Sequence, residues 1–242
     1  LAQRAATEIA VSAWNARHSF IVSTAVPVTD AIEMAVSQSG VFVIADIGDA
    51  TNGGSLGDST RVLRALLDRQ QSGLPSGPSA ISISDASAVV AAMRAGEGSP
   101  ADLVVGSGPP ESFNASTNVS GVVLRLWQRK ITYTHPAASG VIDDPGAAVV
   151  FEVGDITVVL HSMPVRVIDP ALYVAAGIDI FQQRLLQAKS HISYRAGFDQ
   201  VSSGSILADT DGPTAANLAT LPFFKRPVPM FPFEDIEWTP SC

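Results

Sequence analysis

The sequence predicts a mixed α/β fold in which parallel βα units come first and a largely antiparallel sheet with short helices follows. Apolar runs at residues 41–45 and 81–83 each precede a segment with apolar residues at helical spacing, a pattern typical of parallel crossovers. From residue 101 onward, β-rich runs follow one another across short turns, which favours antiparallel pairing. With 242 residues, 46% of them hydrophobic, the chain is long enough to bury a full core.

The first forty residues are expected to form a helical lead-in. Residues 1–20 place Ile9, Ala13 and Phe20 at spacings that build one apolar helix face. A second helix is predicted over 31–39, with Thr29 or Asp30 as its N-cap. The sequence therefore divides into residues 1–40 and a main domain over residues 41–242 that ends in a Pro-rich tail.

The stretch 41–71 reads as a strand, a loop rich in Gly, Asp and Asn, and a helix with Asp58 or Ser59 as N-cap. Such a loop is the first candidate site, because α/β proteins bind ligands at the carboxyl ends of strands and beside helix N-termini. A Walker A phosphate loop does not fit, since Asn52 replaces its first glycine and Asp58 its lysine. A carboxylate there repels phosphate, so the loop is suited to a cationic or neutral group.

The remaining elements follow from apolar runs and capping residues. A helix over 86–95 begins after Asp85, and Gly154-Asp155 reads as a two-residue hairpin turn. Asp169 is predicted to cap a helix that runs to Ala176, and residues 191–198 to form a short helix or turn. The Pro-rich end with its interleaved aromatic residues is expected to cover an apolar surface. Further strands are predicted at 103–105, 119–127, 130–134, 147–153, 156–161, 185–188 and 206–208.

Two groups of residues could carry chemistry. Asp46, Asp49 and Asp58 lie on one loop, and paired carboxylates can bind a hard cation or shift one another's pKa for acid–base work. The alternative is structural: Asp58 caps the helix, and the other polar side chains hydrogen-bond within the loop.

Lys189, His191 and Arg195 follow a predicted buried strand. They could hold a substrate carboxylate or stabilise an oxyanion, or instead form a salt-bridge network that links the two parts of the chain. Ser59 and Ser190 lie in no Gly-x-Ser-x-Gly elbow, so a serine hydrolase is not expected.

Composition excludes several classes of function. The net charge of −8 argues against nucleic-acid binding, and no apolar run reaches the roughly 20 residues of a membrane helix. The four histidines (His18, His135, His161 and His191) include no i, i+4 pair, and the single cysteine is Cys242. A complete zinc site within this chain is therefore not expected. The absence of a signal-peptide pattern and of any internal disulfide favours a cytoplasmic location.

Three segments resemble the second half of the microcystinase C (MlrC-like) metallopeptidases. The family's loop reads roughly Asp-Asn-Pro-Gly-Gly-Gly-x-x-Gly-Asp-Ser/Thr-Thr, and this sequence departs from it at Ala50, Thr51 and Asn52. Residues 189–198 are similar to Lys-Ser-x-x-His-Phe-Arg-Ala-x-Phe with the histidine displaced to position 191, and residues 209–214 are close to Asp-Thr-Pro-Gly-Ala-Thr. The loop residues shared with the family are Asp49, Gly53, Gly54, Gly57, Asp58, Ser59 and Thr60.

The resemblance implies the C-terminal half of a zinc-dependent peptidase or amidohydrolase that acts on small or linearised peptides, with this half forming part of the substrate cleft. It implies that the zinc ligands lie in an upstream domain, that the helix at 1–20 is the end of that domain, and that the isolated chain is inactive. The implied partners are a small peptide, the upstream domain and a second copy in a homodimer. The implied catalytic residues are Asp58, Lys189, His191 and Arg195, and the implied substrate-binding residues are Asp49, Asn52, Gly53, Gly54 and Ser59.

The departures at residues 50–52 and at His191 support a second hypothesis. The same fold could serve as a non-catalytic module for ligand binding or dimerisation.

Overall fold

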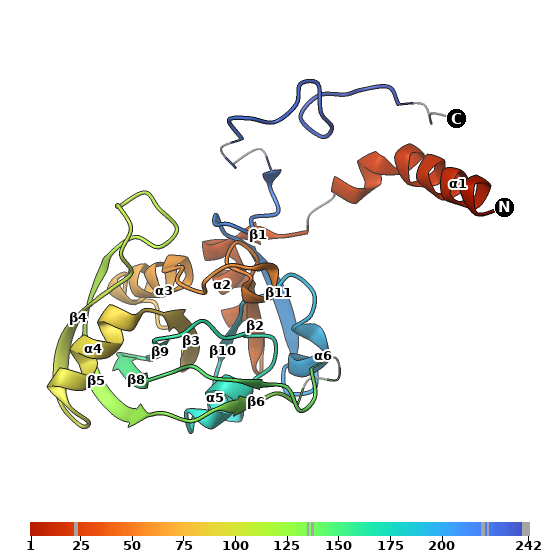
Figure 1. Cartoon of the computed structure of the whole chain (residues 1–242). Coiled ribbons are helices and arrows are strands. Elements are labelled where there is room, and N and C mark those ends of the chain that lie inside the picture. Colours follow the sequence, from red (N-terminus) through yellow and green to blue (C-terminus); the bar gives the residue numbers. More distant parts are fainter. Residues whose placement is uncertain (22–23, 135, 137, 219–220, 222, 239–242) are drawn as a thin grey trace. The chain divides into compact units, whose positions relative to one another are not determined.

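The computed structural model describes residues 1–21, 24–134, 136, 138–218, 221 and 223–238 (Figure 1). His135, Pro222, Pro240 and Cys242 lie outside the described residues. The chain divides into two compact units, one made of residues 1–24 and 217–242 and the other of residues 25–216. The predicted domain limits at residues 40 and 41 stay a prediction.

The unit of residues 25–216 is built on one nine-stranded sheet with the strand order β1-β11-β2-β10-β3-β9-β8-β5-β4. The six strands from β1 to β9 in this order run parallel, and β8, β5 and β4 continue the sheet in antiparallel fashion. The predicted mixed α/β fold is confirmed, and its parallel and antiparallel parts share a single sheet because β9 pairs with both β3 and β8. The strands are β1 Val26–Pro27, β2 Phe42–Asp46, β3 Ser79–Ser84, β4 Pro100–Val105, β5 Thr117–Trp127, β8 Ala148–Val153, β9 Ile156–His161, β10 Leu185–Ala188 and β11 Gly204–Asp209. A separate pair is formed by β6 Ile131–Thr132 and β7 Ile142–Asp143.

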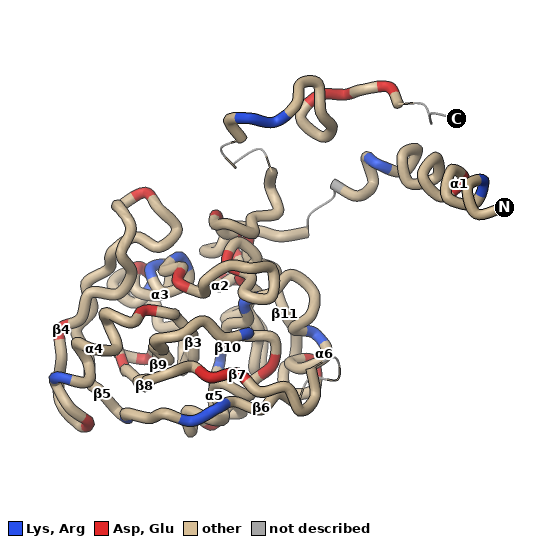
Figure 2. Tube along the Cα trace, in the orientation of Figure 1, with Lys and Arg blue, Asp and Glu red and all other residues tan. Residues whose placement is uncertain are grey.

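Helices cover both faces of this sheet. The helices α2 Val28–Val36, α3 Arg61–Gln71 and α4 Ala86–Ala95 pack into one hydrophobic core, and α5 Ala171–Ala175 and α6 Arg195–Phe198 border the other. In β2, Ile44 belongs to the first core while Val43 and Ala45 belong to the second. Strands buried on both faces are expected to be apolar throughout, and β3, β9 and β10 contain no Lys, Arg, Asp or Glu (Figure 2).

The predicted helix caps are partly wrong. Helix α2 begins at Val28 with Pro27 as its N-cap, so Thr29 and Asp30 lie in its first turn. The N-cap of α3 is Thr60, so neither Asp58 nor Ser59 holds that position. The N-cap of α2 lies two or three residues before the predicted one, and that of α3 one or two residues after it, because tertiary contacts decide between neighbouring candidate positions.

Other local predictions are confirmed. Asp85 caps α4 by accepting the Ala88 N–H at 2.9 Å, and Gly154 opens the hairpin turn between β8 and β9 with a φ of 63°. Strand β10 delivers Lys189 at its carboxyl end, as predicted. The cap predicted at Asp169 is wrong: the N-cap of α5 is Pro170, and Asp169 Oδ1 accepts the Ala171 N–H at 2.8 Å from one position further back.

The unit of the two chain ends contains α1 Ala2–Asn15 and the short 3₁₀ helix η1 Arg17–Ile21. The ring of Trp14 lies 6.0 Å from that of Phe231 and 5.6 Å from that of Trp238, and Arg17 donates to Asp235 at 3.1 Å. Phe231 and Trp238 of the Pro-rich tail thus pack against α1, as expected for a tail that covers an apolar surface, whereas Phe224 is exposed. None of the helices in the described chain has the length and apolar character needed to cross a membrane.

Candidate functional site

The candidate site lies at the carboxyl ends of β2 and β10, which are neighbours in the sheet. The loops that follow these two strands run to opposite faces of the sheet. Strand β2 leads through residues 47–60 to α3 on the first face, whereas β10 leads through residues 189–194 to α6 on the second. In α/β proteins, ligands bind at the carboxyl ends of neighbouring strands whose connections run to opposite faces of the sheet.

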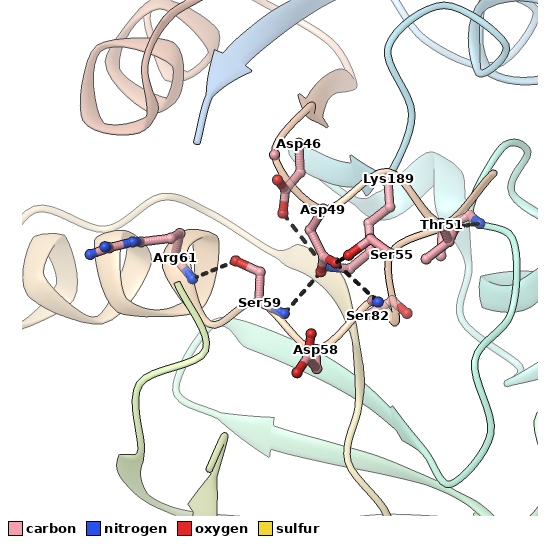
Figure 3. A network of polar contacts seen from close by, with 12 residues as sticks. Asp46, Asp49, Thr51, Ser55, Asp58, Ser59, Arg61, Ser82 and Lys189 are labelled. Atoms are coloured by element: carbon pink, nitrogen blue, oxygen red, sulfur yellow. Dashed lines mark hydrogen bonds and ion pairs between the residues drawn. The ribbon is translucent and has the colours of Figure 1, made fainter. Parts of the chain in front are cut away.

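Lys189 is the centre of a buried polar network at this point (Figure 3). Its Nζ lies 2.7 Å from Asp49 Oδ2 and 3.5 Å from Asp46 Oδ2, and none of the three side chains is exposed. Asp49 also accepts the Ser55 hydroxyl and the N–H groups of Gly57 at 3.0 Å and Ser59 at 2.9 Å. A buried carboxylate surrounded by four donors holds the Gly-rich loop in one conformation.

Asp46 connects the network to two further strands. It accepts the Thr210 hydroxyl at 2.5 Å and Gln187 Nε2 at 3.0 Å. Thr210 follows β11, and its Oγ1 accepts the Gly48 N–H at 2.8 Å. One ammonium group and two carboxylates therefore join the segments that end β2, β10 and β11.

The two carboxylates differ in their pKa shifts. Burial raises the pKa of Asp46, and the Lys189 charge offsets this only in part. Burial also acts to raise the pKa of Asp49, but the Lys189 charge and hydrogen bonds from Lys189, Ser55 and Ser59 outweigh it, so that this pKa is lowered. Burial acts to lower the pKa of Lys189, but the two carboxylates outweigh it and raise that pKa. Lys189 and Asp49 thus form the ion pair, and Asp46 is the carboxylate that more readily takes up a proton.

A neutral histidine lies beside the network. His161 Nδ1 donates to the Met163 carbonyl at 2.8 Å, so its Nε2 accepts the Ser82 hydroxyl at 2.9 Å. Burial lowers the pKa of His161 to about 4. The Ser82 N–H donates to Gln187 Oε1 at 3.0 Å, which links this histidine to Asp46 through Gln187.

Gln187, Thr210 and Ser82 were not predicted as site residues. Gln187 is the one polar residue of the buried strand β10, Ser82 is buried within β3, and Thr210 is buried directly after β11. A buried polar residue at the carboxyl end of a strand is the signal that could have identified them.

The predicted catalytic cations do not converge on one point. Lys189 is fully buried, whereas His191 is half-buried with its Nε2 at 2.8 Å from the Thr214 carbonyl. Arg195 is exposed, with its guanidinium 6.0 Å from the Tyr194 ring.

The exposed residues of the loop are Asn52, Gly53, Gly54 and Leu56, and the first three form the crest of the loop. Asn52 Nδ2 donates to Ser193 Oγ at 3.1 Å, and the Thr51 N–H donates to the Lys189 carbonyl at 3.2 Å, so the two loops meet above the buried network. Gly54 has a φ of 100°, and a Cβ at this position would meet no atom within 4 Å. The backbone of this crest is therefore open to an approaching ligand.

Asp58 lies apart from the other two carboxylates. In Figure 3 its side chain points away from Lys189, and its Oδ2 accepts Asn114 Nδ2 at 2.8 Å. Ser59, whose N–H binds Asp49, is buried and its hydroxyl donates to the Phe113 carbonyl at 3.2 Å. The structure thus brings Asp46, Asp49 and Lys189 together and leaves Asp58, which is half-buried, outside their network.

The described residues do not fit a zinc ion. No group of three or more His, Cys, Asp or Glu side chains in the described part of the chain is arranged to hold a metal. The carboxylates of Asp46 and Asp49 are already engaged by Lys189, Thr210, Gln187 and loop donors, which occupy the lone pairs that a metal would need.

Comparisons with known proteins point to one family. The family described as MlrC C-terminus matches residues 44–225. Three solved chains match, among them the crystal structure of a protein from Mesorhizobium sp. BNC1 provisionally assigned as a metallopeptidase. That protein is 27% identical with a TM-score of 0.85, and the match covers 96% of this chain but 46% of the other, so this chain spans less than half the length of that relative. No curated protein matches.

Proposed function

This chain belongs to the family of MlrC C-terminal domains, and from that premise we propose that it forms one wall of the substrate cleft in a zinc-dependent peptidase or amidohydrolase. The proposed substrates are small or linearised peptides, and the zinc ligands are proposed to come from a part of the protein outside this chain. The family match and the likeness to a protein provisionally assigned as a metallopeptidase support a peptidase-family domain.

The proposal is supported mainly by one observation: the exposed loop crest of residues 52–54 is held in one conformation by the network around the buried Lys189. Binding sites work best when their supporting residues are fixed before the ligand arrives. The network of Lys189 with Asp46 and Asp49 supplies this support, and the crest of Asn52, Gly53 and Gly54 is exposed above it.

The proposed roles follow from exposure. Asp58, His191 and Arg195 retain exposed surface and are the proposed groups for contact with substrate, together with Asn52 and the two crest glycines. Lys189, Asp49 and Ser59 are buried, so we assign them the support of the loop rather than direct contact. A cytoplasmic location and a homodimer remain predictions.

The test compares a longer protein that contains this domain with the chain of residues 1–242. Zinc content and hydrolysis of short linear peptides are measured for both. We expect zinc binding and turnover only in the longer protein, and loss of turnover in its Asp58→Asn variant. Asn118→Ala, on an exposed position of β5, is the control and should leave turnover unchanged.

Zinc-dependent turnover by the 242-residue chain alone would contradict the proposal that the zinc ligands lie outside this chain. A longer protein that binds zinc but cleaves no peptide or amide would favour the second hypothesis, a module for ligand binding or dimerisation. This second hypothesis is tested because the loop departs from the family's pattern at Ala50, Thr51 and Asn52.

A further inference from the structure

The hairpin between β4 and β5 ends in a tip, residues 106–116, that returns to the start of α3. The Thr60 N–H donates to the Phe113 carbonyl at 2.9 Å, and the Thr60 hydroxyl donates to the Ala115 carbonyl at 2.9 Å. Arg61 Nη2 donates to the Glu111 carbonyl at 3.0 Å. These contacts fix the tip against the loop that carries Asp58 and place Asn114 opposite it.

The orientation of the Asn114 amide follows from its neighbours. Asn114 Nδ2 donates to Asp58 Oδ2 at 2.8 Å, and Asn114 Oδ1 lies 3.0 Å from the Ser112 hydroxyl, which also lies 2.8 Å from the Pro109 carbonyl. The reversed amide would place its oxygen against a carboxylate oxygen, which is repulsive.

The backbone around Asn114 is equally constrained. Its carbonyl accepts the N–H groups of Ser107 at 3.1 Å and Gly108 at 2.9 Å. A Cβ at Gly108 would lie 2.1 Å from Ser112 Oγ and 2.2 Å from Asn114 Oδ1, so only glycine leaves room for the amide in this position.

Asp58 is held at one oxygen and open at the other. Its side chain is half-buried, and among the described residues its Oδ1 has no hydrogen-bond partner. A carboxylate fixed by one donor and open on its other side resembles the arrangement of base and orienting group used in acid–base catalysis.

We propose that Asn114 is a positioning residue that holds the Asp58 carboxylate toward the substrate, and this inference rests on the proposed function. Asn114 itself touches no substrate and acts through Asp58. Its contribution is the fixed direction of the free carboxylate oxygen, which an unrestrained aspartate on a partly exposed loop would lack.

The test uses Asn114→Leu in the longer protein, a change that removes the donor and keeps a similar shape. We expect kcat for a short linear peptide to fall about 10- to 100-fold with KM unchanged, as for loss of a hydrogen bond to a charged group. Asn118→Leu on the exposed side of β5 is the matched control and should keep the wild-type kcat.

The Asp58→Asn variant and the double variant with Asn114→Leu complete the test. If Asn114 acts through Asp58, the double variant is no slower than Asp58→Asn alone. A wild-type kcat in Asn114→Leu, or full activity in Asp58→Asn, would overturn the inference.

A readout independent of turnover separates this inference from the proposed function. Crystal structures of the 242-residue chain should show one Asp58 side-chain conformer in the wild type and several in Asn114→Leu, with unchanged thermal unfolding confirming that the variant folds. A longer protein without any hydrolysis would refute the proposed function, whereas a single unchanged Asp58 conformer in Asn114→Leu would refute the positioning itself.

Discussion

Replacing Lys189 by methionine should be one of the most destabilising single changes in this chain. The side chain has no exposed surface, and its Nζ lies 2.7 Å from Asp49 and 3.5 Å from Asp46. Methionine fills a similar volume without a charge, so the packing is kept while two buried carboxylates lose their cation. Removing one partner of a buried ion pair costs about 3–5 kcal/mol of the free energy of unfolding.

The loss of unfolding free energy in Lys189→Met should grow as the pH rises. Without the ammonium group, burial holds the folded-state pKa of both carboxyls above their ordinary value of 3.8. The folded variant then binds more protons than the unfolded chain above that pH, so its stability falls as the pH rises. The difference between the wild type and Lys189→Met is therefore larger near pH 7 than near pH 4.

The assay is urea unfolding of the 242-residue chain, followed by circular dichroism at both pH values. Lys130→Met is the control, because Lys130 is exposed and its replacement should change the free energy of unfolding by less than about 0.5 kcal/mol. A Lys189→Met variant that loses no more stability than Lys130→Met near pH 7 would refute the buried ion network. A loss of the expected size that is the same at both pH values would refute the protonation argument alone.

Three further outcomes follow from the same network. Asp46→Asn should gain stability relative to the wild type as the pH rises above 3.8, because burial raises the pKa of Asp46 and its ionisation in the folded protein then costs free energy. Urea unfolding from about pH 4 to about pH 7 measures this. A difference in unfolding free energy between the two proteins that does not change with pH would contradict it. The imidazole of His161 should stay neutral until the pH approaches about 4, which NMR titration of its ring protons checks; a midpoint near its ordinary value of 6.5 would show that the ring is not buried as described. Thr210→Val should lose about 1–3 kcal/mol of unfolding free energy, because it removes one of the donors to Asp46 and leaves the Gly48 N–H without its partner. Thr132→Val at an exposed position of β6 should lose little.

Much of the fold could be predicted from local patterns. The strands at 41–45 and 185–188, the cap at Asp85 and the hairpin turn at Gly154 each depend on residues within a few positions of one another. The predicted caps at Thr29 and Asp58 were wrong because several polar residues stand near each helix start, and local sequence does not choose among them.

The candidate site was only partly predictable. The loop after residue 45 and the segment after residue 188 were both selected, and the structure places their buried members, Asp49 and Lys189, 2.7 Å apart. Both residues were predicted to contact substrate, but no local pattern in the sequence indicates that they are completely buried. Burial depends on how loops from β2, β10 and β11 close over one another, and those strands are adjacent only in the folded sheet.

The mixed α/β class, most of the elements and the loop of the candidate site were predictable from the sequence, because apolar periodicity, glycine and capping residues act over a few positions. Only the tertiary structure decided that β10 lies between β2 and β3, which pairs Lys189 with carboxylates about 140 positions earlier in the chain. It also decided that Asp58 faces Asn114 on the tip of a distant hairpin rather than Asp49 on its own loop. Such partners are set by strand order and by the path of each loop, and local sequence patterns carry no information about either.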